Sequence, residues 1–175
     1  MVDPLRIHQA YIDGDVGALR SALGDPADFP HTRGPQGLGE NILEYAIYHA
    51  PIPLLRTLLE LGADPNYEED GGFPSLIAAI TSGRDDTNEV VALLLEFGAD
   101  PARRGANDQT PLHDAAATGD SALVELLLSH GADAQARTRV DDCSSPLEEA
   151  QARGDEGIAR VLRRSMIRIE DPTSS

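Results

Sequence analysis

The sequence is poor in several residue types, and each shortage excludes something. It contains no tryptophan and only 4% aromatic residues, so its core must be built from aliphatic side chains. It contains no lysine either: the 14 basic residues are all arginine, against 30 acidic residues, which gives a formal net charge of −16. Such a negative surface disfavours nucleic acid or an anionic membrane as the main partner. The charge instead favours a basic protein partner, or it serves solubility alone.

Cysteines and long apolar runs are scarce as well. Cys143 is the only cysteine, so no internal disulfide can form and nothing requires an oxidising compartment. No stretch approaches the roughly 18 apolar residues of a membrane span, and the N-terminal residues lack the pattern of a signal peptide. We therefore expect a cytoplasmic protein. The absence of lysine, together with frequent Ala, Gly and Asp, favours a bacterial source.

Three closely similar phrases recur along the chain. They are LLELGADP at 58–65, LLEFGADP at 94–101 and LLSHGADA at 127–134, and their first leucines are 36 and 33 residues apart. A period of this length is typical of a solenoid, in which neighbouring copies of one supersecondary unit bury their apolar faces against each other. The sequence therefore predicts a stack of repeats.

The clearest copy, at 108–137, predicts two helices. Thr110 can cap the first helix through its hydroxyl, and Pro111 suits the first helical position, where an N–H would have no partner. Gly119 ends this helix, an apolar leucine-rich segment forms the second, and Gly131 ends that one in turn. The residues after Gly131 then run extended into a turn.

The phrase TPLHDAA at 110–116, with the second helix and the Gly-Ala-Asp turn behind it, resembles the ankyrin repeat, whose signature contains T-P-L-H-x-A at a period of about 33 residues. Aligned on these marks, the chain contains five repeats. The first and last are degenerate, as expected of terminal repeats that expose one face to water. The resemblance implies an all-α ankyrin-repeat solenoid of stacked helix-turn-helix repeats in two layers, with projecting finger loops. We expect one domain over 1–168 and a polar tail at 169–175, with repeats at about 4–36, 37–69, 70–105, 106–140 and 141–168.

Two helix starts carry a capping signature that does not depend on the resemblance. Asn41 with Glu44, and Ser145 with Glu148, have the spacing at which a cap and a glutamate three residues later satisfy each other's backbone N–H groups. Two segments depart from the repeat: a long loop rich in Pro and Gly at 29–40, and an inserted charged turn at 83–89 between the helices of the third repeat.

The residues that suggest chemistry favour structural roles instead. His113 beside Asp114 has the look of an oriented base, but in ankyrin repeats this histidine belongs to the structural TPLH phrase and ties neighbouring repeats together. The other histidines fall in different repeats and none has metal-ligand spacing; they are His8, His31, His49 and His130. We therefore expect neither a metal nor a cofactor.

Acidic turns and the lone thiol give no catalytic signal either. A calcium loop beginning at Asp13 would need an acid at its twelfth position, where the chain has Gly24. The neighbouring acids Asp141 and Asp142 would raise, not lower, the pKa of the Cys143 thiol. Neither a phosphate-binding loop nor a nucleophile motif is present. The sequence predicts a protein that is not an enzyme.

The resemblance implies that the chain is a monomer which binds another protein on the concave surface formed by the fingers and first helices. The exposed positions carried over from the family are Leu38, Glu40, Tyr45, Tyr48, His49, Asp70, Phe73, Thr81, Ser82, Asn107, Gln109, Ala117, Thr118, Asp141, Asp142, Ser144 and Arg153. Tyr45, Tyr48, His49 and Phe73 are the expected anchors, because aromatic side chains dominate binding hot spots. Packing between repeats is the competing interpretation for Tyr45 and Phe73.

Two other functions remain open at this point. The negative charge also fits an inhibitor or immunity-type protein that neutralises a basic enzyme such as a nuclease. A small hydrolase or metal enzyme has no motif in its favour.

Overall fold

The computed structural model describes residues 3–31, 41–67, 73–139 and 143–170, and of residues 107 and 168–170 it describes the backbone alone. Within these residues the chain forms ten α-helices and one short 3-10 helix. They are α1 (Pro4–Asp13), α2 (Val16–Ala22), α3 (Ile42–His49), α4 (Ile52–Glu60), α5 (Ser75–Thr81), α6 (Thr87–Glu96), η1 (Ala106–Asp108), α7 (Pro111–Thr118), α8 (Ser121–Ser129), α9 (Pro146–Ala152) and α10 (Glu156–Glu170). The helices follow one another as five pairs, and the predicted all-α solenoid is confirmed.

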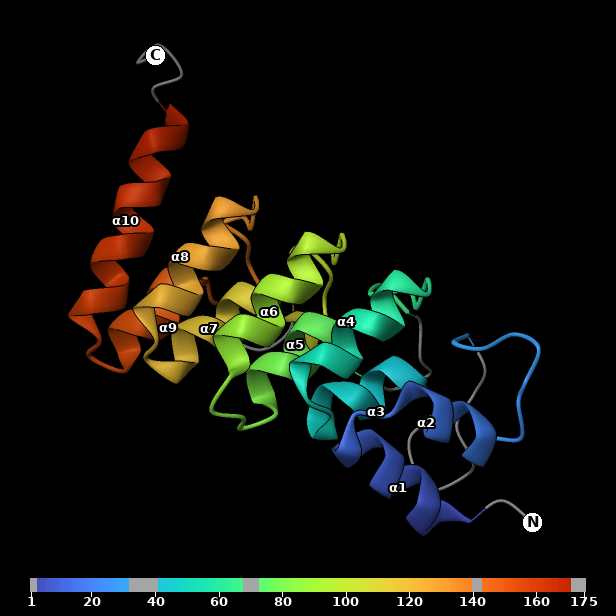
Figure 1. Ribbon diagram of the computed structural model, residues 1–175. Helices are drawn as coiled ribbons and strands as arrows, with labels where there is room; N and C mark the ends of the chain where they lie inside the picture. The colour runs from blue at the N-terminus through green and yellow to red at the C-terminus, as the bar shows by residue number, and fades with distance from the viewer. Residues whose placement is uncertain (1–2, 32–40, 68–72, 140–142, 171–175) are drawn as a thin grey trace. The chain divides into compact units, whose positions relative to one another are not determined.

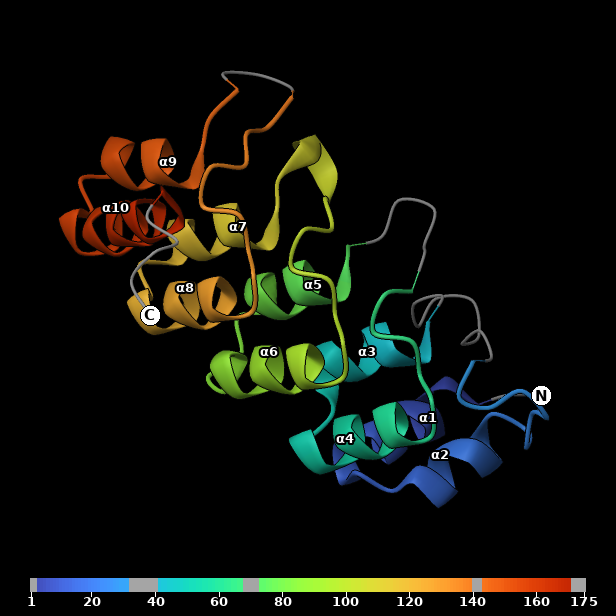
Figure 2. The ribbon, with the colours of Figure 1, turned by 90° about the horizontal axis from the view of Figure 1, so that it is seen from above.

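The chain divides into two compact units, which we call unit 1 (up to Ala99) and unit 2 (from Asp100). In unit 1, the first helices α1, α3 and α5 form one layer and the second helices α2, α4 and α6 form the other (Figures 1 and 2). In unit 2, α7 packs against α9 and α8 against α10 in the same manner (Figure 2). A single domain over 1–168 remains a prediction.

The core is aliphatic, as the shortage of aromatic residues requires. Leu54, Leu58 and Leu94 of the second-helix layer are almost completely buried in unit 1. Ala46 and Ala79 have no exposed surface, so their short side chains allow first helices of neighbouring repeats to approach closely. None of the helices within the described residues has the length and apolar character needed to cross a membrane.

Each residue of the recurring Gly-Ala-Asp phrase has a fixed role in the turn after a second helix. The glycine adopts a left-handed conformation that ends the helix, the alanine is buried under the turn, and the aspartate carboxylate accepts the N–H two residues further on at 2.8 Å. The three copies are Gly62 with Ala63 and Asp64, Gly98 with Ala99 and Asp100, and Gly131 with Ala132 and Asp133. The repetition of the phrase is therefore the repetition of one turn.

The helix starts agree with the capping analysis in one case and differ in the other. Ser145 and Glu148 form the reciprocal pair: the Ser145 hydroxyl accepts the Glu148 N–H at 3.2 Å, and the Glu148 carboxylate accepts the Ser145 N–H at 2.8 Å. Asn41 also caps its helix, but it accepts the N–H of Leu43 at 2.8 Å, so the predicted reciprocal pairing with Glu44 is wrong. The Asn41 amide bonds to the second helical N–H, which satisfies one orphan donor without help from a glutamate.

Aromatic side chains are distributed very unevenly between the two units. All four tyrosines and all three phenylalanines precede residue 100, and no aromatic residue follows it. The core of unit 2 is correspondingly built from short and aliphatic residues such as Leu112, Ala115, Leu127, Ile158 and Leu162. Any surface that recognises a partner through tyrosine or phenylalanine must therefore belong to unit 1.

Candidate functional site

Five rings lie in contact on the first-helix layer of unit 1. We call them the ring cluster: His8 and Tyr11 of α1, and Tyr45, Tyr48 and His49 of α3. The Tyr45 ring is central, with centroids 4.8 Å from Tyr11 and 4.4 Å from His49. His8 lies 5.4 Å from His49, and Tyr48 lies 6.2 Å from it. These tilted and edge-on arrangements are the ones that aromatic rings prefer.

Helix periodicity and two hydrogen bonds hold the ring cluster in place. Tyr45 and His49 are one helical turn apart, so their rings lie over the same face of α3. The Tyr45 hydroxyl is 2.7 Å from Nδ1 of His8, which links α3 to α1. The Tyr11 hydroxyl donates to the Ile42 carbonyl at 3.2 Å, where it binds the first turn of α3. The site is thus assembled across two repeats before any partner arrives.

Exposure within the ring cluster increases from its base to its rim. Tyr11 is 2% exposed and belongs to the core, Tyr45 and Tyr48 are half-buried, and His49 is exposed. Burial raises the pKa of the Tyr45 hydroxyl and lowers the pKa of the His49 imidazole. Both groups are therefore uncharged at neutral pH, and the rim offers flat, neutral surface in a chain of strongly negative net charge.

Neighbouring groups also shift the pKa values of the two outermost side chains, Tyr48 and His49. Burial is the largest cause that raises the pKa of Tyr48, the Glu44 carboxylate adds to it, and a hydrogen bond with Thr81 opposes it. For His49, the positive charges of His8 and Arg84 add to burial in lowering the pKa. The hydroxyl of Tyr48 therefore stays protonated at neutral pH.

The other described residues predicted for unit 1, Phe73, Thr81 and Ser82, lie outside the ring cluster. Phe73 is 42% exposed and makes no ring contact with the cluster within the described residues; its carbonyl accepts the Tyr67 hydroxyl at 3.2 Å. Thr81 is exposed and Ser82 half-buried, and each hydroxyl donates to a carbonyl of its own helix. Phe73 thus remains a separate candidate at the edge of a finger.

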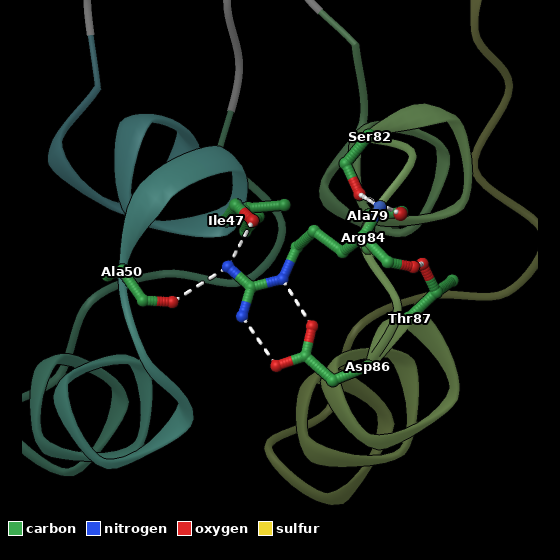
Figure 3. A network of polar contacts seen from close by, with 7 residues as sticks. All are labelled: Ile47, Ala50, Ala79, Ser82, Arg84, Asp86 and Thr87. Carbon is green, nitrogen blue, oxygen red and sulfur yellow. Dashed lines mark hydrogen bonds and ion pairs between the residues drawn. The ribbon is translucent and has the colours of Figure 1, made fainter. Parts of the chain in front are cut away.

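Arg84, in the inserted turn of the third repeat, links two repeats of unit 1 (Figure 3). Its Nη1 donates to the carbonyls of Ile47 and Ala50 at the end of α3, at 3.2 and 2.7 Å. Its Nε and Nη2 donate to the carboxylate of Asp86 at 2.6 and 2.7 Å. The Arg84 side chain is only 13% exposed. The charged turn at 83–89 is therefore occupied with holding the repeats together, because a cation at a helix C-terminus stabilises its free carbonyls.

The candidates in unit 2 form a different kind of surface. Gln109, Ala117 and Ser144 are half-buried, while Thr118 and Arg153 are exposed. The hydroxyl of Thr118 donates to a carbonyl of its own helix, as in unit 1. No ring lies among these residues, so unit 2 offers short polar side chains where unit 1 offers aromatic ones.

Two carboxylates of neighbouring repeats face each other on unit 2. Burial, and then the nearby charge of Glu149, raises the pKa of Asp114 to about 6. One carboxylate oxygen of Asp114 is buried without a hydrogen-bond partner among the described residues. Glu149 itself accepts the hydroxyl of Ser144 at 2.8 Å. Burial and the nearby Glu149 therefore both disfavour the ionised form of Asp114 near neutral pH.

His113 has the structural role that the sequence favoured. It has no exposed surface, its Nδ1 accepts from the Thr110 N–H at 3.2 Å and lies 2.8 Å from the Thr110 hydroxyl, and its Nε2 lies 3.2 Å from the Ser144 carbonyl. One neutral tautomer satisfies all three contacts, with Nδ1 accepting and Nε2 donating. The buried imidazole thus joins two consecutive repeats.

Several predicted residues cannot be placed. Leu38, Glu40, Asp70, Asp141 and Asp142 lie outside the described residues, and so does the side chain of Asn107.

Sequence reasoning missed two members of the ring cluster. It treated His8 as one of several scattered histidines and did not consider Tyr11. Both lie on α1, at helix positions that face α3 of the next repeat. Alignment of the first helices position by position would have found them, because His8 occupies the register position of His113, whose side chain reaches into the following repeat.

Stacked pairs of antiparallel helices, a recurring Gly-Ala-Asp turn and histidine links between repeats define a helical repeat protein of the solenoid class. A family model described as ankyrin repeats matches residues 43–138 and 76–171, with three copies. The chain belongs to the ankyrin-repeat family. Repeats of this family are generally protein–protein interaction modules, and their fold is typically non-catalytic.

Relatives match the chain over their repeat regions. BRCA1-associated RING domain protein 1 of Caenorhabditis elegans is 32% identical over 127 residues, which are 72% of this chain and 17% of that protein. The human 2-5A-dependent ribonuclease is 42% identical over 84 residues, 47% of this chain and 11% of the relative. Mouse ankyrin repeat and SOCS box protein 16 is 43% identical over 79 residues, 42% of this chain and 17% of the relative. The chain thus spans less than a third of the length of each of these proteins.

Proposed function

We propose that the chain is a non-enzymatic binding protein that holds a protein partner against the first-helix layer of unit 1, with the ring cluster as its main contact. The observation that carries this proposal is the graded exposure of five contacting rings around Tyr45. A buried base with an exposed aromatic rim gives a rigid surface, which loses little side-chain entropy when a partner binds. Tyrosine is also among the residues that most often dominate binding energy.

The charge of the chain supports a basic partner. With 30 acidic and 14 basic residues, the molecule attracts a positively charged protein over long range and speeds its encounter. The neutral rim of the ring cluster would then supply the short-range contacts. We propose a cytoplasmic setting, in a bacterium, for a chain that is a monomer on its own.

Inhibition of a basic enzyme such as a nuclease is the second candidate, and the same negative charge supports it. The two functions differ in what binding does to the partner. Addition of the chain to the isolated partner should abolish enzymatic turnover under the second proposal and leave it unchanged under the first.

The test of the binding surface compares one position on the first-helix layer of each unit. Once a partner is isolated with the intact chain, Tyr48→Ala should raise its dissociation rate by about 30-fold, the effect of a hot spot of about 2 kcal/mol. Thr118→Ala, on the first-helix layer of unit 2, is the matched control and should change the rate less than about twofold. Biolayer interferometry measures both. If Thr118→Ala had the larger effect, the ring cluster would not be the binding surface.

Salt dependence separates the roles of charge and rings. Screening shortens the range of attraction to about 8 Å at physiological ionic strength, so association should slow as salt rises. Dissociation should respond little to salt and strongly to Tyr48→Ala and Phe73→Ala, because buried aromatic anchors set how long a complex lasts. Binding that ignored both salt and the aromatic substitutions would place the interface elsewhere.

A further inference from the structure

The last helix differs from every other second helix because it does not stop. In α8 the chain leaves the helix at Gly131, in a left-handed conformation with φ of 90°. The aligned position in the last repeat is Met166, and α10 continues to Glu170. It has 15 residues where α8 has 9, and Figure 1 draws it as the longest ribbon of unit 2. After alignment of the two repeats, α10 therefore continues past the position at which the chain leaves α8.

A groove of about 760 Å³ lies at this place, between α8, the turn that follows it and α10. Its apolar lining includes Leu128, Ala132 and Val161. Leu128 and Val161 are half-buried, so apolar surface remains for an occupant to cover. The volume is large enough for several side chains.

Two arginines line the α10 side of the groove. Arg160 and Arg164 are exposed and one helical turn apart, so they point to the same side of α10. In the described part of the chain neither guanidinium forms a hydrogen bond or an ion pair, whereas Arg163 pairs with Glu156. Guanidinium groups bind carboxylates strongly and with defined geometry. Within the described residues, two guanidinium groups without a partner thus lie beside an apolar floor.

The local charge is opposite to that of the whole molecule. Residues 153–168 contain five arginines and two carboxylates, in a chain whose net charge is −16. The opposite side of the groove carries Glu125 on α8 and Asp133 in the turn. An occupant that fits must present carboxylates to α10, aliphatic groups to the floor and, where it faces α8, no further negative charge.

We propose that this groove binds an amphipathic helix of a partner protein, which places aliphatic side chains on Leu128 and Val161 and two carboxylates, one turn apart, on Arg160 and Arg164. A helix fits because its side chains at i and i+4 have the spacing of the two arginines. Ile167, 67% exposed and three residues beyond Arg164, extends the apolar contact along α10. The chain would then hold two partners of opposite charge on different surfaces.

The probe is a synthetic amphipathic peptide of about 18 residues, or five turns, with leucines along one face and a pair of glutamates one turn apart at its edge. A second peptide carries lysines in place of the glutamates. Binding of each to the full chain is followed by fluorescence anisotropy. The chain should bind the glutamate peptide and not the lysine peptide.

Charge reversal locates the contact. Arg160→Glu with Arg164→Glu should weaken binding of the glutamate peptide by at least about tenfold, and should create binding of the lysine peptide, since like charges across an interface repel and opposite charges attract. Arg6→Glu with Arg20→Glu is the matched control: both arginines are exposed, and the change in net charge is the same. It should change binding less than about twofold, because only long-range attraction is altered.

A second pair of variants tests the groove without any change of charge. Ser165→Trp fills the groove, whereas Ser121→Trp adds the same ring at an exposed position at the start of α8. The first should abolish peptide binding and the second should not, with unchanged helicity by circular dichroism in both. Unchanged binding to the reversed and the filled variants would overturn the proposal.

Two other outcomes would also overturn it. If sedimentation reveals a dimer that the Arg160 and Arg164 reversals dissociate, and neither peptide binds, the occupant is a second copy of this chain. If vesicles with anionic lipid bind in place of the peptide, the surface is a membrane contact. The effect of the reversed and filled variants on binding of the glutamate peptide does not depend on whether the ring cluster binds its own partner, because these variants alter residues of unit 2 alone.

Discussion

Unit 1 and unit 2 use the same helical frame to present opposite chemistry on their first-helix layers. Unit 1 has five contacting rings there, whereas unit 2 has short polar residues and a pair of carboxylates, Asp114 and Glu149. The contrast is sharpest at the histidine of the first helix. His113 is completely buried and bonded to backbone and hydroxyl groups, but His8, at the same register position, is half-buried and bonded to the hydroxyl of Tyr45. One position can therefore stabilise the stack in one unit and shape a surface in the other.

The largest expected effect separates these two histidines. His113→Ala should lower the free energy of unfolding by about 1–3 kcal/mol, because it leaves the buried N–H of Thr110 without its acceptor and removes the link to the Ser144 carbonyl. His8→Ala should cost clearly less, since its surroundings are partly hydrated, but it should weaken partner binding through Tyr45. Urea denaturation measures the first quantity and biolayer interferometry the second. Equal losses of stability would mean that both histidines are structural.

Arg84 tests whether unit 1 depends on its inserted turn. Arg84→Ala removes four hydrogen bonds to the α3 carbonyls and to Asp86, and we expect a loss of about 1–2 kcal/mol from these charged contacts. Arg56→Ala is the matched control, because Arg56 also forms two hydrogen bonds to a carboxylate, that of Glu96, but on the exposed surface. Its loss should be much smaller. Equal effects in thermal denaturation would contradict the linking role of Arg84.

Asp114 gives unit 2 a pH dependence of its own. Its carboxyl titrates near 6 in the folded chain, against an ordinary 3.8 in the unfolded chain. Between these values the folded chain holds a proton that the unfolded chain releases, so this contribution to stability increases as the pH falls from about 6 toward 3.8. Asp114→Asn should therefore be more stable than the natural chain at pH 7 by about 1 kcal/mol, a value reduced by partial solvent screening. The two stabilities should converge below the ordinary pKa of aspartate.

The control for Asp114 is Ser121→Ala, an exposed residue of the same unit without a titratable group. Its difference from the natural chain should stay constant across the same pH range. Denaturation midpoints of the three proteins at several pH values give the comparison. A constant difference for Asp114→Asn as well would show that burial of Asp114 costs nothing.

The smallest expected effect is the pH dependence of stability through His49 of unit 1, and its sign is opposite to that of Asp114. The pKa of His49 lies below its ordinary 6.5, so the unfolded chain takes up this proton first and stability is lost as the pH falls through 6.5. His49→Gln should remove that loss, while Thr118→Gln, at the aligned position of unit 2, should not. The change should be slight because the imidazole is exposed. A gain of stability on acidification through His49 would mean that its surroundings are negative.

The sequence was sufficient to predict the helices and turns, because contacts between residues close together in the sequence determine them. Thr110, Pro111 and Gly119 set the ends of α7 through contacts within a few residues, and the Gly-Ala-Asp phrase closes its own turn. Such contacts leave a signature at fixed spacing. The continuation of α10 past Met166 follows the same local rule, since Met166 stands where the other second helices have a stopping glycine.

The surfaces were harder to predict because they depend on residues far apart in the chain. Tyr45 and His49 were expected, but the hydrogen bond between His8 and Tyr45 spans 37 residues and has no local pattern. Arg84 was interpreted as part of a charged loop, because nothing near it reveals the α3 carbonyls that it binds. The sequence shows that Arg84 is charged and can face water. The carbonyls of the neighbouring repeat, which only the structure shows, explain why it is largely buried instead.

The uneven supply of rings gives the molecule an internal spectroscopic label. All four tyrosines lie in unit 1, so intrinsic fluorescence reports the melting of that unit alone, whereas far-UV circular dichroism reports helices of both. Coincident transitions by the two probes are the signature of all-or-none unfolding. If fluorescence and helicity are lost at the same urea concentration, the ten helices form one cooperative block. If they separate, unit 1 and unit 2 melt independently, and the two midpoints can be measured without an attached dye.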